Sequence, residues 1–324
     1  MIATLALCVV AAITLPHLLR LDRVTPSTAA ALWTVSLALR ALSAVLVVVY
    51  LVLFAPATAV FDAVTHWCWH AVLPALTTHL GLDGHDLGDA VVVLPAMLLA
   101  ASGVSIAFGV MRAGRGVRRL LAHETLGDGP EGSVIVGGSE VVMAAAGFKQ
   151  PRLVVSVGAL AKLDDAELAA GLGHERGHIM RHHRWVMLAA ELFRGLGRGV
   201  PGARVAQRQL AFQLERDADA WAIRHHDRAA LARVICKAAM SHLAPSPGYG
   251  LLTGPDDVTR RLDELIDAPS LVAGLRARLM RLAATLGVTL VLLLTLAVPA
   301  TVASGYAERV AGPSGVTHCR GLPG

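Results

Sequence analysis

Residues 164–180 read DDAELAAGLGHERGHIM, and this stretch decides the fold of the domain around it. Asp164 fits a helix N-cap, and Glu167 follows three positions later, as in a capping box. Apolar residues then recur at helical spacing, so the pattern predicts a helix over residues 165–180. The His-Glu-Arg-Gly-His pattern lies near the middle of that helix.

Two histidines of this helix are one turn apart and face the same way, His174 and His178. Two imidazoles at that spacing can bind one Zn²⁺. Glu175 sits beside them, where a carboxylate can take a proton from the attacking water. The sequence therefore predicts one zinc ion per chain, with Glu175 as the general base.

A second helix is predicted over residues 205–225, and it contains LERDAD at 214–219. Glu215 on this helix can complete a His₂Glu zinc site that leaves the fourth position open for water. Asp219 lies one turn later and can accept the outer N–H of a ligand imidazole. Asp217 is expected to face away from the site, toward solvent.

The other histidines near the two helices leave alternatives open. His182 can support the site from behind a ligand or be an ordinary solvated residue. An oxyanion donor is still needed, and Arg224 or His225 are candidates. If His182 or His225 instead occupied the water position, the zinc would be structural rather than catalytic.

The residues before the first helix read as extended structure. Runs at 133–136 and 141–146 are prone to form strands, and a Gly-Phe-Lys-Gln-Pro turn leads into LVVSV at 153–157. This predicts a small sheet with a hairpin, in which LVVSV is a candidate edge for an extended peptide. The glycine-rich residues 195–199 are expected to form a mobile connector between the two ligand helices.

The composition is that of an integral membrane protein. Of 324 residues, 55% are hydrophobic and 16% charged, and the mean hydropathy is +0.58. Four stretches are apolar and long enough to cross a bilayer: about 1–19, 30–54, 90–110 and 282–303. The lipid bilayer is therefore an expected partner.

Basic residues set the orientation of these spans. Arginines cluster after the first span, after the third and before the fourth, whereas residues 55–89 contain no Lys or Arg. The multi-pass protein is then expected in the plasma membrane with both termini outside and residues 112–281 in the cytoplasm. Because this topology accounts for the net charge of +5, and aromatic residues are only 4%, no direct nucleic-acid binding is expected.

One arginine and two cysteines lead to further predictions from this topology. Arg40 lies inside the second span, where it should pack within the bundle or snorkel to the cytoplasmic face. Cys68 and Cys319 are the two cysteines that this topology places outside, so a Cys68–Cys319 disulfide is expected.

The chain resembles the BlaR/MecR-type membrane metallopeptidases and, more distantly, the HtpX and CaaX-processing proteases. The matching residues are His174 to His178, Glu215 with Ala218-Asp219, and LVVSVGAL leading into LDDAELAAGLGHE. The resemblance implies a zinc endopeptidase of the gluzincin type that cleaves a cytoplasmic protein or peptide, with a transcriptional repressor as one candidate substrate. The chain differs from BlaR/MecR receptors because only about twenty residues follow the fourth span, where those receptors carry a penicillin-binding sensor.

The sequence thus predicts a mainly α membrane protein with four transmembrane helices and a cytoplasmic α+β zincin-like (gluzincin) protease domain between spans three and four. The expected parts are a membrane domain with three transmembrane helices, a protease domain, a fourth span and a short extracytoplasmic tail, at 1–111, 112–281, 282–303 and 304–324. The alternatives to regulatory proteolysis are HtpX-like quality control and a non-catalytic signalling scaffold that contains zinc. The oligomeric state does not follow from the sequence.

Overall fold

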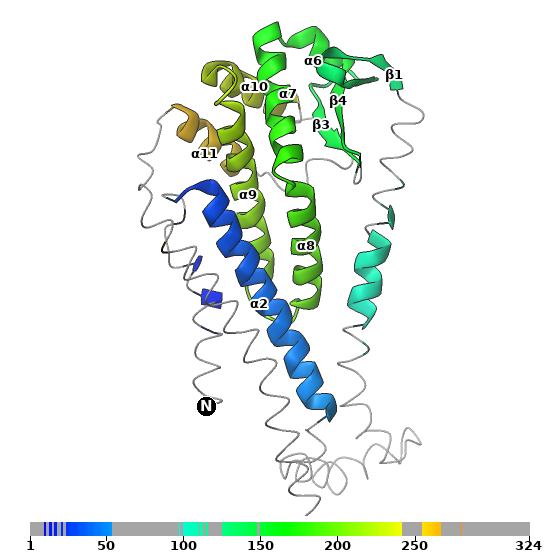
Figure 1. Cartoon of the computed structure of the whole chain (residues 1–324), viewed down its shortest axis with the longest axis vertical. Coiled ribbons are helices and arrows are strands. Elements are labelled where there is room, and N and C mark those ends of the chain that lie inside the picture. Colours follow the sequence, from blue (N-terminus) through cyan, green and yellow to red (C-terminus); the bar gives the residue numbers. More distant parts are fainter. Residues whose placement is uncertain are drawn as a thin grey trace, which may run out of the picture.

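A computed structural model of the chain is shown in Figure 1. It describes residues 24–53, 100–109, 125–147, 150–241 and 255–266, and single positions at 10, 13, 14, 16, 17, 21, 97, 111, 112, 115 and 279. Most of the predicted span over 1–19, the whole span over 282–303 and the tail lie outside these residues. So do Cys68 and Cys319, so the expected disulfide stays a prediction.

The described residues form mostly helices, with one small sheet. Their bounds are α2 Pro26–Leu53, β1 Thr125–Asp128, the 3-10 turn η4 Pro130–Gly132, β2 Val134–Val136, β3 Met143–Ala146, β4 Arg152–Ser156, α6 Val157–Lys162, α7 Asp165–Met180, α8 His183–Leu196, α9 Ala203–Ala222, α10 Arg228–Ser241 and α11 Pro255–Ile266. In Figure 1 the sheet lies beside α7, and α2 runs alongside α9 and α8.

The capping box predicted for the first ligand helix is present. The Asp164 carboxylate accepts from the Glu167 N–H at 2.8 Å, and the Glu167 carboxylate accepts from the Asp164 N–H at 3.1 Å. The helix begins at Asp165 and ends at Met180, as predicted. The helix predicted over 205–225 is also present, as α9.

The sheet has the strand order β1-β2-β4-β3. β3 and β4 form the predicted antiparallel hairpin, and β2 pairs with β4 in parallel. The expectation that LVVSV forms an edge was wrong, because β2 and β3 flank β4 on its two sides. Its side chains from Leu153 to Ser156 are all buried, which is typical of an interior strand. The open edge on that side of the sheet is β3.

The predicted glycine connector lies two residues later than expected, from Gly197 to Gly202. Gly195 and Leu196 complete α8, a helix that the sequence analysis did not identify. Gly202, with φ of 82°, precedes α9 as its N-cap. The two ligand helices are therefore joined by a packed helix and a tight turn.

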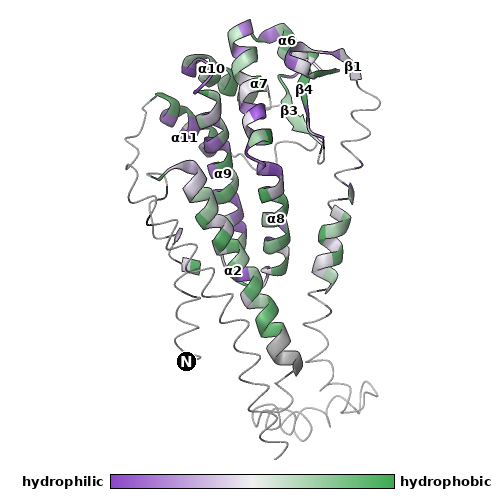
Figure 2. Cartoon of the chain, in the orientation of Figure 1, coloured by the Kyte–Doolittle hydropathy of each residue, from purple (hydrophilic) through white to green (hydrophobic). Residues whose placement is uncertain are grey.

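One hydrophobic core joins α2 to α8 and α9. It includes Trp33 and Leu37 of α2, Ala190 of α8 and Leu210 and Leu214 of α9. Figure 2 shows apolar residues along α2 and hydrophilic residues on parts of α7 and α11. The helix that carries Glu215 thus packs directly on the most apolar described helix.

Among the described residues, one helix is long and apolar enough to cross a membrane, Pro26–Val48 within α2. It overlaps the predicted span over 30–54. A shorter apolar helix, Ala100–Gly109, lies in the predicted span over 90–110. These findings favour membrane association.

Arg40 is buried inside this bundle. Its guanidinium donates to the carbonyl oxygens of Ser36 at 3.0 Å, Ile13 at 3.2 Å and Pro201 at 3.1 Å. It also lies 2.9 Å from Nε2 of His17. Of the two alternatives predicted for Arg40, packing within the bundle is the one observed, and it fastens α2 to the turn before α9.

Candidate metal centre

The site begins where α7 packs closely on β3. Gly171 of α7 faces Met143 of β3, and a Cβ on Gly171 would come within 2.4 Å of the Met143 side chain. This close packing brings Glu175 to the strand, where its Oε2 accepts the Ala145 N–H at 2.9 Å. Glu175 therefore lies at the open edge of the sheet.

Three side chains converge beside Glu175: His174 and His178 from α7 and Glu215 from α9. Their candidate ligand atoms all lie within 4.8 Å of one another. The two Nε2 atoms are 3.1 Å apart, and they lie 3.4 Å and 3.5 Å from the Glu215 oxygens. The helical spacing of the histidines and the packing of α9 on α7 produce this convergence.

The outer nitrogen of His174 is held by an acid. Its Nδ1 lies 2.8 Å from Oδ1 of Asp219, where the sequence analysis expected Asp219 to act. When the imidazole is neutral, as a metal requires, an N–H at Nδ1 leaves the lone pair of Nε2 toward Glu215. Asp219 thus fixes the tautomer in which His174 can bind a metal.

An arginine of α11 neutralises the acids of α9. Arg261 donates to both oxygens of Asp219, at 2.8 Å and 2.7 Å, in a bidentate pair. Its Nη1 also lies 2.9 Å from Oε2 of Glu215. Because all three side chains are largely buried, this arginine offsets charge that water cannot solvate. Arg261 was not among the predicted site residues, because nothing in the sequence VTRRLDELI distinguishes it.

The outer nitrogen of His178 has a different support. Its Nδ1 lies 3.0 Å from Nδ1 of His183, and Nε2 of His183 lies 3.1 Å from Oδ2 of Asp217. The expectation that Asp217 faces solvent was wrong, since it is 6% exposed. α8 begins at His183 and covers that side of α9. The second ligand is therefore backed by a histidine–aspartate pair.

The remaining candidates lie elsewhere. His182 is exposed and has a left-handed backbone with φ of 56°. His225 is exposed too, and its Nδ1 lies 3.2 Å from the Trp221 carbonyl oxygen. Neither belongs to the group of possible metal ligands found among the described residues.

Burial and charge shift the pKa values of the site in opposite directions. Burial alone would lower the pKa of His174, but the Asp219 and Glu215 carboxylates outweigh it and raise that pKa to about 10. Burial lowers the pKa of His178 to about 3. Burial, helped by the charge of Glu215, raises the pKa of Glu175 to about 7.

The pKa values of the two α9 carboxyls are both held below their ordinary range. Burial would raise them, but His174 and Arg261 outweigh it at Glu215. The same two cations, with Arg261 first, outweigh burial at Asp219. The site therefore keeps two carboxylates ionised beside a histidine that carries a proton in the metal-free protein.

These residues fit a divalent metal such as zinc. Two imidazole nitrogens and one carboxylate are ligands that zinc prefers, and a three-residue set leaves a position open. Both histidines present Nε2 inward and have their outer nitrogens supported, as metal ligands usually do. His174, His178 and Glu215 form a possible metal site on these grounds.

Comparison with known proteins agrees with this geometry. No curated protein and no solved structure matches the chain. Residues 128–265 match the sequence model of peptidase family M48, a range that contains β2 to α10 and nearly all of α11. The match gives no support to the BlaR/MecR or the HtpX subtype over the other, and it supports an M48 metallopeptidase domain in residues 128–265.

Proposed function

We propose that the chain is a membrane-tethered zinc endopeptidase that hydrolyses peptide bonds of a cytoplasmic protein, in a regulatory circuit such as repressor cleavage. One observation carries the proposal. Glu175 lies at the open edge of β3, beside the convergent side chains of His174, His178 and Glu215. A base, a metal site and a strand edge are thus together, as peptide hydrolysis requires.

Each residue has a role in this reaction. His174, His178 and Glu215 would hold a zinc ion, which would supply a Lewis acid for the scissile carbonyl and for the attacking water. Glu175 takes a proton from the attacking water and gives it to the leaving amine. Asp219 and the His183–Asp217 pair hold the two imidazoles in position.

The substrate is proposed to add to β3. β3 is the edge of the sheet nearest α7, and the Ala145 N–H points to Glu175 rather than to β4. A peptide lying along this edge in an extended conformation would pass the base and the metal site.

The cytoplasmic placement of the domain rests on the charge asymmetry of the sequence. Arginines cluster at both ends of residues 112–281, next to the predicted spans, whereas the loop over residues 55–89 contains no arginine or lysine. The shared core of α2 and α9 supports a domain that works close to the bilayer.

A second candidate function is an HtpX-like quality-control protease for membrane proteins, which is equally compatible with the M48 match. A regulator should have very few substrates, whereas a quality-control enzyme should have many. Comparing the membrane and cytoplasmic proteomes of cells with and without the protein separates the two. A zinc-containing scaffold is less well supported, since the possible ligand set among described residues has three members and not four.

The proposed activity is tested with Glu175→Gln in the full chain. The variant should keep its zinc and lose cleavage of a protein substrate found by that proteomic comparison. Replacement of Gln150, an exposed residue, by Glu is a control that should cleave normally. Normal cleavage by the Glu175→Gln variant would refute the assigned base.

A further inference from the structure

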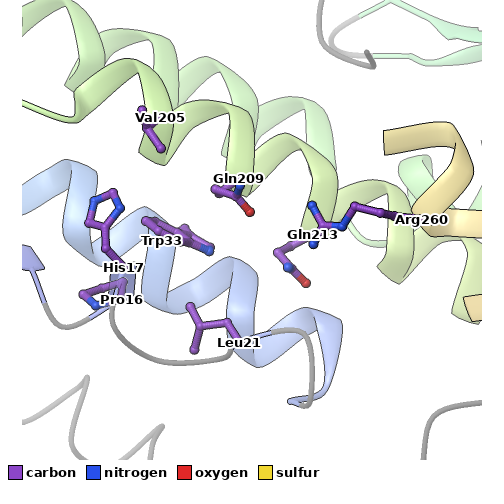
Figure 3. Close-up of a pocket in the computed structure, with 8 residues that line it drawn as sticks. All are labelled: Pro16, His17, Leu21, Trp33, Val205, Gln209, Gln213 and Arg260. Carbon is purple, nitrogen blue, oxygen red and sulfur yellow. The ribbon is translucent and has the colours of Figure 1, made fainter. Parts of the chain in front are cut away.

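A cavity of about 200 Å³ lies between α2, α9 and α11, apart from the metal centre. Figure 3 shows its lining, which consists of Pro16, His17, Leu21, Trp33, Val205, Gln209, Gln213 and Arg260. None of these side chains is acidic. The cavity is thus lined by apolar groups and polar side chains, with a cation at one end.

Two buried donors at the cavity have no acceptor among the described residues, Trp33 Nε1 and Gln213 Nε2. Trp33 is 4% exposed and Gln213 is fully buried. A buried donor without an acceptor destabilises the fold by about 1–3 kcal/mol. A bound molecule that accepts from both donors would remove this penalty. In Figure 3 the indole nitrogen of Trp33 lies toward the side where Gln209 and Gln213 stand.

The orientation of both donors is fixed by neighbours. Oε1 of Gln213 accepts from Nη1 of Arg216 at 2.7 Å, which leaves its NH₂ group for the cavity. The ring of His17 meets the Trp33 indole edge-on, with centroids 4.9 Å apart. The amide nitrogen and the indole can only donate, so the occupant must present acceptor oxygens.

The third polar group adds a positive charge. Arg260 lies over the Phe212 ring, 4.0 Å from the centroid, and contributes its guanidinium to the cavity wall. Its Nη1 also lies 3.8 Å from Oδ1 of Asp257, which does not line the cavity. Two donors and a cation, with no acid among the described residues that line the cavity, favour an anionic occupant. Pro16, Leu21 and Val205 supply an apolar side to the same cavity.

The position of the cavity indicates what the anion is attached to. It lies at the start of α2, whose residues Pro26–Val48 are long and apolar enough to cross a membrane. Tryptophan is enriched at the level of lipid headgroups. A volume of about 200 Å³ suits a headgroup whose chains remain in the bilayer, not a whole lipid.

We infer that this cavity binds the phosphate-containing headgroup of an anionic phospholipid, through Trp33, Gln213 and Arg260. The bound headgroup bridges α2 and the helix that carries Glu215. The inference does not depend on the proposed peptidase activity, because none of the three residues belongs to the metal centre.

The test uses the full chain with phosphatidylglycerol or phosphatidylcholine, and native mass spectrometry counts the retained lipid. One phosphatidylglycerol molecule should bind, with an affinity about tenfold higher than that of phosphatidylcholine, as expected for hydrogen bonds to a charged group. Gln213→Glu keeps an acceptor for Arg216 but replaces the donor with a negative charge. Trp33→Phe keeps the ring but removes the N–H. Each variant should lose about tenfold in phosphatidylglycerol affinity.

Two matched variants control for the changes in charge and in aromatic content. Gln150→Glu and Trp185→Phe alter exposed residues away from the cavity and should bind lipid as the wild type does. The Trp33 indole N–H resonance, identified by its absence in Trp33→Phe, should shift on adding phosphatidylglycerol and not phosphatidylcholine.

Three results would overturn the inference. One is equal retention of both lipids by the wild type. Another is unchanged phosphatidylglycerol binding by both Gln213→Glu and Trp33→Phe. The third is an indole resonance that shifts as far with inorganic phosphate alone as with lipid, which would make the cavity a site for the free ion.

Discussion

Nδ1 of His183 lies 3.0 Å from Nδ1 of His178, and this contact gives the second metal-site histidine its own support. His183 in turn reaches Asp217 at 3.1 Å, whereas His174 contacts Asp219 directly at 2.8 Å. Each imidazole is thus connected to a separate carboxylate of α9. With Nδ1–H donated outward, both histidines keep Nε2 available for a metal.

Replacing His183 by Ala should weaken zinc binding. Loss of a group that supports a ligand usually reduces metal affinity by about 10- to 100-fold. His178 then loses the partner that fixes its tautomer, while the three ligands remain. Competition with a zinc-chelating dye measures the affinity directly, without any assay of activity.

The neighbouring residue provides the control for His183. His182 is exposed, and His182→Asn keeps a residue that tolerates its left-handed backbone. This variant should bind zinc as the wild type does. Equal zinc affinities for the His183→Ala and His182→Asn proteins would contradict the support assigned to His183.

Zinc binding should release a proton and strengthen as the pH rises. The pKa of His174 is raised to about 10 from an ordinary 6.5, so His174 is protonated at pH 7 in the metal-free protein. Zinc requires the neutral imidazole and must displace that proton. The affinity should therefore rise about tenfold per pH unit between pH 6 and 8. Calorimetry in buffers of different ionisation enthalpy counts the released protons.

Asp219→Asn tests the cause of that proton release. The variant removes the carboxylate that contributes most to raising the pKa of His174 while keeping a side chain of the same shape. The imidazole should then lose its proton at a lower pH, so the affinity should level off earlier. A pH dependence identical to that of the wild type would show that Asp219 does not hold the proton on His174.

Glu175 should set the acidic limit of activity. Its pKa of about 7 in the metal-free site means that a fraction near one half is protonated at neutral pH. A protonated carboxyl cannot act as a base, so turnover should fall as the pH drops through that pKa. A nearby dication would move this limit to lower pH. Glu175→Gln should reduce turnover by about 10²- to 10⁴-fold at pH values above this limit, and the difference from the wild type should shrink below it. A pH–rate profile with one cleavable substrate measures both effects.

The parts of the fold and site that local rules govern could be predicted from the sequence. The capping box at Asp164 sets the start of α7, and the spacing of His174 and His178 fixes their common face. Glu215 could be paired with them because a metal needs a third ligand of suitable chemistry. The strand predicted at 153–157 is present as β4, but it lies in the interior of the sheet and not at the predicted edge.

The parts that could not be predicted depend on how distant elements pack. The left-handed backbone of His182 sets the direction in which α8 leaves α7, and His183 contacts Asp217 as a result. The periodicity of the sequence does not indicate the angle between two helices. Arg261 reaches the site from α11, far along the chain, out of an ordinary amphipathic helix. The three consecutive apolar residues at 153–155 were a usable signal for an interior strand, since apolar and polar residues alternate in a half-buried edge strand.

Arg261→Met should destabilise the protein more than any other single change of charge in α11. Arg261 bonds both oxygens of Asp219 and also lies 2.9 Å from Glu215, and all three groups are largely shielded from water. Removing one partner from a buried set of charges typically costs about 3–5 kcal/mol. The loss should be largest in the metal-free protein, because zinc would offset part of the negative charge that remains. Thermal unfolding of the zinc-loaded and zinc-free chains measures this difference.

Arg208→Met, at an exposed position of α9, is the control and should leave both melting temperatures nearly unchanged. If the two variants unfold at the same temperature without zinc, the carboxylates of Glu215 and Asp219 do not need Arg261, and α11 is not a structural part of the site.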